Sequence, residues 1–232
     1  NNETGVVQPV AAITAAARAA GGVSVIDAVQ AAGRIPLDIT DACADFLILS
    51  SHKIGGPKGV GAIVSASDLM MPAPLVRGGG QERGHRAGTE NVPGIAGFAA
   101  AAREAREGLA RIGAIATMRD RFEAALIGRE PNAEIFGHAA PRLANTSFFA
   151  LPGIKAETAQ IAFDLAGVAL SAGSACSSGK VGPSHVLKAM GRGDTAGALR
   201  VSIGHATDEQ DLELFEKALA GLLARRERTK AA

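Results

Sequence analysis

The sequence predicts an α/β protein with a mainly parallel sheet, followed by a smaller α+β unit. Two observations favour the sheet: short apolar, β-branched segments recur in the first half, and helical or turn-rich stretches separate them. These segments span residues 23–28, 44–50 and 59–65. A third observation is the change near residue 91 to long stretches rich in Ala, Glu and Arg. We expect the two parts to cover residues 1–105 and 106–232.

The elements can be justified in chain order. Residues 8–20 are Ala-rich and end at Gly21 and Gly22, which is typical of a helix with a stop signal. Residues 91–129 are helical in pattern but too long for one ordinary helix, so breaks are expected at Gly108 and Gly113. The expected elements after that are strands at 146–151 and 198–203 and helices at 156–166 and 208–226.

Bulk composition excludes several classes of function. Lys and Arg number 24 against 23 Asp and Glu, and aromatic residues are 3% with no Trp or Tyr, which disfavours nucleic-acid binding. No apolar run approaches the roughly 18 residues of a membrane span. Only Cys43 and Cys176 occur, without paired CxxC spacing, which favours a reducing, cytoplasmic location and disfavours a structural zinc site.

Two polar sites follow predicted strands. Asp27 ends the strand at 23–28, with Gln30 three residues on, and the carboxyl ends of parallel strands line the ligand crevice of open α/β sheets. Alone, Asp27 is better interpreted as a surface acid. Residues 50–53 (SSHK) follow the next strand, so Lys53 could bond covalently to a carbonyl cofactor, although a solvated loop lysine is commoner. The neighbouring glycines lack the GxxxxGK[ST] order of a Walker loop.

Residues 171–178 (SAGSACSS) form a small, polar loop around Cys176. Such a setting suits a nucleophile that moves between a substrate and a partner, while free cysteines are often inert and buried. The surrounding Ser and Gly favour the first interpretation. Cys43 is expected to be structural. No spacing pairs the remaining histidines as metal ligands; these are His85, His138, His185 and His205.

Together, these motifs resemble cysteine desulfurases of the NifS/IscS type, which are fold-type I pyridoxal-phosphate enzymes near the class V aminotransferases. The resemblance covers essentially the whole chain, and the AGSAC loop at residues 172–176 is its most discriminating motif. The motifs that carry it are residues 1–9 (NNETGVVQP), 27–30 (DAVQ), 51–53 (SHK), 55–62 (GGPKGVGA), 78–89 (GGGQERGHRAGT), 171–178 and 199–204 (LRVSIG).

The resemblance implies a role for each matching residue. Lys53 is the lysine that binds pyridoxal 5'-phosphate covalently, and Cys176 is the nucleophile that accepts sulfur as a persulfide. Asn2 and Arg200 hold the substrate carboxylate, and Asn2 also lies in the cofactor site. The remaining cofactor contacts are Asp27 at the pyridinium nitrogen, Gln30 near the phenolic oxygen, Ser50 and His52 at the phosphate, and Thr89 at the phosphate of a neighbouring subunit.

The implied reaction removes sulfur from L-cysteine, giving L-alanine and a persulfide that passes to an iron–sulfur scaffold or another acceptor protein. The resemblance further implies a homodimer, while the composition already indicates that neither nucleic acid nor a membrane is a partner. It gives no firm metal site, although Cys176 could transiently bind an iron–sulfur cluster.

Complete family members carry a substantial segment before the NNET motif. We therefore expect this chain to be a fragment, with apolar surface exposed on its first half and weak or no activity alone. Two alternatives stay open. One is a class V aminotransferase or selenocysteine lyase, which would not need Cys176 as a sulfur acceptor. The other is an inactive module for dimerisation or scaffold binding.

Overall fold

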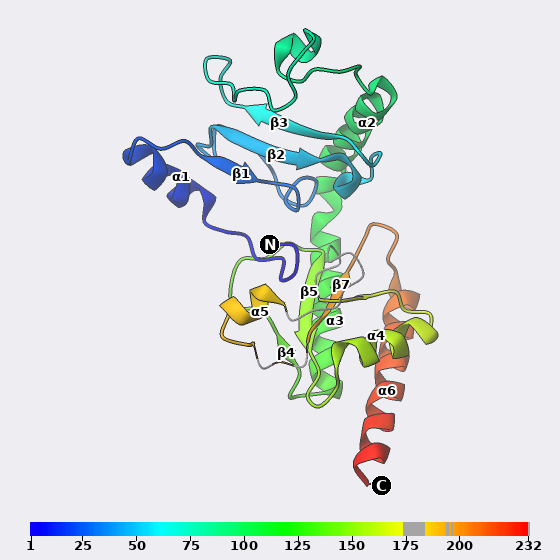
Figure 1. Ribbon diagram of the computed structural model, residues 1–232. Coiled ribbons are helices and arrows are strands. Elements are labelled where there is room, and N and C mark those ends of the chain that lie inside the picture. The colour runs from blue at the N-terminus through cyan, green and yellow to red at the C-terminus, as the bar shows by residue number, and fades with distance from the viewer. Residues whose placement is uncertain (174–183, 194, 196, 232) are drawn as a thin grey trace. The chain divides into compact units, whose positions relative to one another are not determined.

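The computed structural model describes residues 1–173, 184–193, 195 and 197–231 (Figure 1). It divides into two compact units. The N-terminal unit is Gln8–Ala110, and the C-terminal unit combines Asn1–Val7 with Arg111–Ala232. The assignment of residues 1–105 and 106–232 to a cofactor domain and a small domain stays a prediction.

The C-terminal unit is built on an antiparallel sheet. Its strand order is β4 (Glu134–Ile135), β5 (Thr146–Ala150), β7 (Leu199–Ser202) and β6 (Ser171–Ala172). Its helices are α3 (Ile112–Arg129), α4 (Ala156–Leu165), α5 (His185–Ala189) and α6 (Glu209–Ala231). The expected strands and helices of this region are confirmed. The strands β4 and β6 and the short α5 were not expected, because elements of two to five residues carry no periodic signal.

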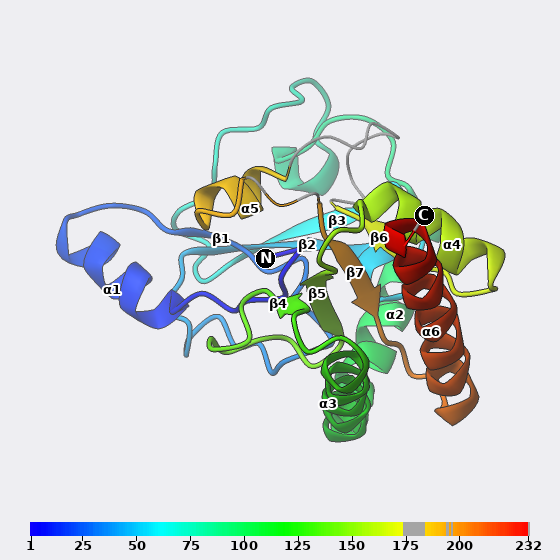
Figure 2. The ribbon, with the colours of Figure 1, turned by 90° about the horizontal axis from the view of Figure 1, so that it is seen from below.

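Strand β5 sends alternate side chains to two cores. Phe149 packs in the larger core with residues of α3, α4 and α6, where the rings of Phe163 and Phe215 stack at 5.2 Å. Phe148 packs on the opposite face with Phe136 and with Leu187 of α5. Figure 2 shows α3 and α6 on one side of the sheet and α5 on the other. Both faces are covered, so β5 and β7 are fixed from both sides.

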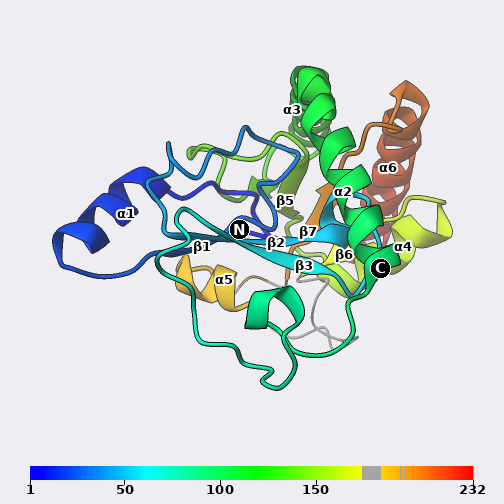
Figure 3. The same ribbon diagram turned by 90° about the horizontal axis from the view of Figure 1, so that it is seen from above.

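The N-terminal unit contains α1 (Val10–Ala19), β1 (Val25–Asp27), β2 (Phe46–Ser50), β3 (Gly61–Ser65) and α2 (Val92–Gly108), with 3-10 turns η1 (Ser51–Ile54) and η2 (Gln81–Gly84). Strand β1 pairs with β2 in parallel, as expected, but β3 runs antiparallel to β2. Only residues 51–60 join β2 to β3, and a parallel partner needs a crossover of a dozen or more residues. Figure 3 shows α1 and α2 at opposite ends of this unit.

The starts of β1 and β2 are joined by side chains. The backbone N–H and the hydroxyl of Ser24 both donate to Asp45 Oδ2 at 2.8 Å, and the Asp45 N–H donates to Ser24 Oγ at 2.9 Å. These bonds, with the Ser24 backbone N–H as the largest cause, hold the pKa of Asp45 below its ordinary value. The pair joins the strands where their register begins, with Val25 opposite Phe46 and Asp27 opposite Ile48.

The long helical stretch breaks as expected at Gly108, where α2 ends and a 3-10 turn (Leu109–Arg111) begins. The break expected at Gly113 is wrong. Gly113 is the second residue of α3, is exposed and has open space around it, so the first turn accommodates it.

The N-terminal unit has a small core around Ala28, Ala44 and Leu47. Many of its large apolar side chains are exposed, as the sequence predicted for the first half. They include Val25, Ile48, Ile63, Val64, Leu69 and Leu75. None of the helices in the described ranges has both the length and the apolar character that a bilayer crossing requires.

Candidate active site

The carboxyl ends of β1 and β2 bring two of the predicted cofactor segments to one edge of the sheet. The strands are parallel neighbours, with Asp27 opposite Ile48 in the register. Asp27 ends β1, and its Oδ1 accepts a hydrogen bond from the Val29 N–H at 2.9 Å, which turns the chain directly after the strand. Gln30 follows in that turn, half-buried. Ser50 ends β2.

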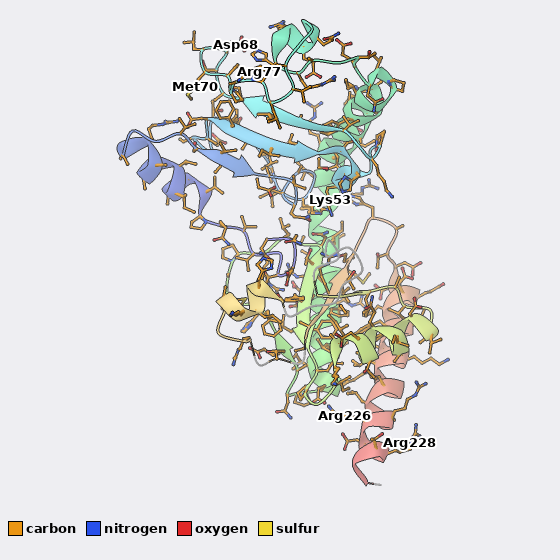
Figure 4. All side chains as sticks on the ribbon, viewed as in Figure 1. Lys53, Asp68, Met70, Arg77, Arg226 and Arg228 are labelled. Carbon is orange, nitrogen blue, oxygen red and sulfur yellow. The ribbon has the colours of Figure 1, made fainter. Side chains whose placement is uncertain are left out.

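The turn after β2 presents Ser50, His52 and Lys53 together. Ser50 Oγ lies 2.9 Å from His52 Nδ1, so a hydroxyl and an imidazole form one polar pair. Lys53 is half-buried within η1, at the end of β2 (Figure 4). Its amine makes no hydrogen bond or ion pair with any residue that the structure describes.

Two glycines after Lys53 are needed, one for its backbone conformation and the other because a side chain would not fit. Gly55 ends η1 in the left-handed region, with a φ of 88°. A Cβ on Gly56 would lie 2.2 Å from Ser51 Oγ and 3.0 Å from Ala101 Cβ on α2. Ser51 is fully buried, and its Oγ has no hydrogen-bond partner among the described residues. The absence of a side chain at Gly56 lets the Lys53 turn sit directly on α2.

In the C-terminal unit, the structure brings Asn2 and Arg200 together across 198 positions of sequence. Asn1 Oδ1 accepts the N–H groups of Glu3 and Thr4, both at 2.9 Å, and so folds the first residues into a turn. The Arg200 Nη1 on β7 donates to the main-chain oxygen of Asn2 at 2.7 Å. The two residues predicted to hold the substrate carboxylate are thus direct neighbours.

Glu3, the residue after Asn2, holds that turn in place through a buried hydrogen bond. Its side chain is fully buried, and Ser184 Oγ donates to Glu3 Oε2 at 2.5 Å. Ser184 also caps α5 by accepting the Leu187 N–H at 3.1 Å. The other carboxylate oxygen, Oε1, has no hydrogen-bond partner in the described part of the chain. The turn that carries Asn2 is therefore tied to the start of α5.

Thr89 follows the turn η2 in the N-terminal unit. It is exposed, and its carbonyl accepts a hydrogen bond from Arg86 Nη1 at 3.3 Å. In the described ranges, no hydrogen bond joins Thr89 to Asp27, Ser50 or Lys53. Its predicted role toward a neighbouring subunit stays a prediction.

The predicted nucleophile, Cys176, lies outside the described residues. Cys43 was expected to be structural, but it is a free, exposed cysteine with a φ of 49°. Among the residues that the structure describes, no group of three or more His, Cys, Asp or Glu side chains could hold a metal ion.

Sequence reasoning did not single out three further residues at these positions. Arg34 donates hydrogen bonds to the carbonyls of Gln30 and Lys53. Ser51, which begins the Lys53 turn, and Glu3, which follows Asn2, are both fully buried. Each depends on a contact between distant segments, so no local spacing reveals it. For Glu3, the position within the NNET motif was the one available signal.

Comparison with known protein families identifies the family of this chain. Residues 1–215 match the family model described as aminotransferase class-V. The chain belongs to the class V aminotransferase family. Among curated members, it is 44% identical to a cysteine desulfurase of Cereibacter sphaeroides over 221 residues, which are 94% of this chain and 56% of that protein. It is 42% identical to a cysteine desulfurase of Gluconacetobacter diazotrophicus, covering 97% of this chain and 57% of that one. This class V chain therefore spans little more than half the length of these relatives.

Solved structures of similar proteins agree with the expected fold. A NifS-like protein from Rickettsia africae superposes with a TM-score of 0.85 at 34% identity, covering 97% of this chain and 60% of the other. The apo structure of a cysteine desulfurase from Thermococcus onnurineus gives 0.80 at 24% identity, which supports the fold alone. The fold-type I class predicted from the sequence is confirmed, and so is the resemblance to desulfurases of the NifS type.

Proposed function

We propose that this protein is a pyridoxal-phosphate-dependent cysteine desulfurase that moves sulfur from L-cysteine to Cys176. The observation that carries the proposal is the shared sheet edge of β1 and β2, which collects Asp27 and the Ser50–Lys53 turn. The curated relatives named cysteine desulfurase support the choice of reaction within the family.

The side chains at this edge fit the chemistry of pyridoxal phosphate. An exposed carboxylate at Asp27 suits a protonated ring nitrogen, because opposite charges favour the charged forms of both groups. The Ser50 hydroxyl and the His52 imidazole lie 2.9 Å apart, and each can donate to a phosphate oxygen when its hydrogen is not donated to the other. The Lys53 amine, half-buried and outside any described ion pair, can bond to the aldehyde carbon.

When bound, pyridoxal phosphate supplies an electron sink at the α-carbon of an amino acid. In our proposal Asp27 holds the proton on the ring nitrogen, and Gln30 lies beside the phenolic oxygen. The Lys53 amine removes the proton from the substrate α-carbon and returns one to it. The Arg200 guanidinium, next to Asn2, binds the substrate carboxylate with two parallel N–H donors.

The proposed sulfur transfer balances without an external oxidant. The Cβ–S bond of L-cysteine breaks, a S–S bond forms at the Cys176 thiolate, and a proton on the carbon completes L-alanine. The thiolate is the competent nucleophile. We further propose that the resulting persulfide passes to an iron–sulfur scaffold or another acceptor protein, and that Cys176 can transiently bind an iron–sulfur cluster. In the proposed homodimer, Thr89 contacts the cofactor phosphate of the neighbouring subunit. The two cysteines in 232 residues suit the reducing cytoplasm.

The test begins with the purified chain and added pyridoxal phosphate. An absorbance band of lysine-bound cofactor, trapped by borohydride and located on Lys53 by mass spectrometry, is the expected result. The Lys53→Ala variant should lose the adduct. Lys58→Ala is the matched control, because Lys58 is exposed in the same turn region and should leave the adduct intact. No adduct in the unsubstituted chain would contradict the proposal for this chain and favour a dimerisation or scaffold-binding module.

The second step separates a desulfurase from its nearest alternatives. Alanine formation from L-cysteine should depend on Cys176, so Cys176→Ala should abolish it while the cofactor band persists. A transaminase or selenocysteine lyase would retain its own activity in Cys176→Ala, and that outcome would overturn the sulfur-transfer assignment.

A further inference from the structure

One arginine joins the main chains of the two cofactor segments in the N-terminal unit. Arg34 Nη1 donates to the carbonyl oxygen of Gln30 at 2.8 Å, and Arg34 Nη2 donates to the carbonyl oxygen of Lys53 at 3.1 Å. The side chain is half-buried. One planar guanidinium therefore bridges the turn after β1 and the turn after β2.

This bridge lies where the sheet no longer holds the two segments. The register of β1 and β2 ends at Asp27 and Ile48, and the Ala28 N–H donates to the Ile48 carbonyl at 3.1 Å. Beyond that bond the two chains are no longer paired with each other. The first enters the turn after β1, and the second stays paired with β3 as far as Ser50 before it enters η1. The distance between Gln30 and Lys53 then depends on contacts of the turns, and Arg34 makes such a contact with both.

The backbone at Gly33 and Arg34 is held in place by its neighbours. Gly33 has a φ of 70°, and a Cβ there would lie 2.9 Å from Ala105 Cβ on α2 and 3.6 Å from Ile54 Cγ2 in η1. The turn therefore packs against both α2 and the Lys53 segment. The Arg34 N–H also donates to the Ala31 carbonyl at 2.9 Å. The guanidinium reaches the two carbonyls from a backbone position with little freedom.

We propose that Arg34 is a positioning residue of the cofactor site, which sets the spacing between Gln30 and Lys53 so that both meet one pyridoxal ring. This inference rests on the proposed function and adds a residue to it. Arg34 acts on its neighbours through their main chain, because the bonds to Gln30 and Lys53 both end on carbonyl oxygens. Arginine suits this task, since its rigid fork presents two parallel donors, whereas lysine offers a single point of attachment.

The experiment compares Arg34→Ala and Arg34→Lys with the matched control Arg18→Ala. Arg18 Nη2 also donates to a carbonyl in this unit, that of Cys43 at 2.9 Å, but it touches neither cofactor segment. Removing two hydrogen bonds should weaken pyridoxal-phosphate binding about ten- to thirtyfold in Arg34→Ala. The pH midpoint of the lysine-bound absorbance band should also move. Arg34→Lys should be intermediate, and Arg18→Ala should match the unsubstituted chain.

A purely structural role would lower the unfolding temperature of Arg34→Ala while cofactor affinity and band position stayed those of Arg18→Ala. That result would overturn the inference and leave the proposed function intact. If the unsubstituted chain forms no Lys53 adduct, the proposed function fails separately, and hydrogen–deuterium exchange decides the positioning. Arg34→Ala should then speed amide exchange at residues 30–35 and 53–56 beyond Arg18→Ala, and equal rates would refute the bridge.

Discussion

Adding one methyl group at Gly56 should disturb the turn that carries Lys53. The new Cβ would lie 2.2 Å from Ser51 Oγ and 3.2 Å from the Ser51 carbonyl oxygen, with Ala101 Cβ on its other side at 3.0 Å. Ser51 is fully buried, so its hydroxyl has little room to turn away. Gly56→Ala should therefore force a backbone shift and destabilise the unit by about 1–3 kcal/mol, the usual range for an overpacked core.

The same geometry predicts a partial rescue. Ser51 Oγ is buried without a described hydrogen-bond partner, so Ser51→Ala removes an unsatisfied polar atom and should be neutral or slightly stabilising. In Ser51→Ala/Gly56→Ala the 2.2 Å overlap disappears, and the contact with Ala101 at 3.0 Å remains. The double variant should regain about half or more of the lost free energy, giving a coupling of about 0.5–2 kcal/mol.

Urea unfolding followed by far-UV circular dichroism measures these differences, because the chain has no Trp or Tyr to report by fluorescence. Gly80→Ala is the matched control in the same unit, since Gly80 has a φ of −85° and open space around its Cβ position. It should leave the free energy of unfolding nearly unchanged. If Gly56→Ala unfolds like Gly80→Ala, or if Ser51→Ala fails to restore stability, the steric argument is refuted.

Two further predictions concern charged groups. Arg142 and Glu123 form a bidentate pair at 2.8 and 2.9 Å, with side chains 6% and 13% exposed, so Arg142→Ala should cost about 3–5 kcal/mol of unfolding free energy. Arg121→Ala, which breaks an exposed pair, should change it by less than about 1 kcal/mol in the same urea titration, and equal losses would contradict the burial argument. Asp45 has a lowered pKa because Ser24 donates to it, so its stabilisation is present above the ordinary carboxyl pKa and is lost as pH falls through the lowered folded-state value. The drop in unfolding temperature from pH 7 to pH 3 should be smaller in Asp45→Asn, and an unchanged drop would refute that role.

The local sequence pattern was sufficient to predict the strands that carry the predicted cofactor residues at their ends. Apolar, β-branched runs with a polar residue at their ends located β1 and β2, and with them Asp27 and Lys53. The direction of β3 was harder to predict, because a strand has a similar composition whether it runs parallel or antiparallel to its neighbour. The short connection after Ser50 decides that β3 runs antiparallel to β2.

Contacts between distant segments could not be predicted in the same way. The Arg34 bridge needs the turn after β1 and the turn after β2 to meet, and the Glu3–Ser184 bond joins residues 181 positions apart. A buried carboxylate is unusual, and nothing in the residues around Glu3 distinguishes it from a surface acid before the fold is known. Only the family resemblance suggested that this region mattered.

The placement of Asn1–Val7 bears on how the proposed reaction is organised. These residues belong to the unit formed by Arg111–Ala232, where Arg200 holds the Asn2 carbonyl at 2.7 Å and Ser184 holds Glu3. The groups proposed for the substrate carboxylate thus share one compact unit, and Asp27 and Lys53, proposed for the cofactor, share the other. A substitution such as Arg200→Ala should therefore weaken L-cysteine binding without reducing the Lys53 adduct, because the cofactor residues keep their own sheet edge.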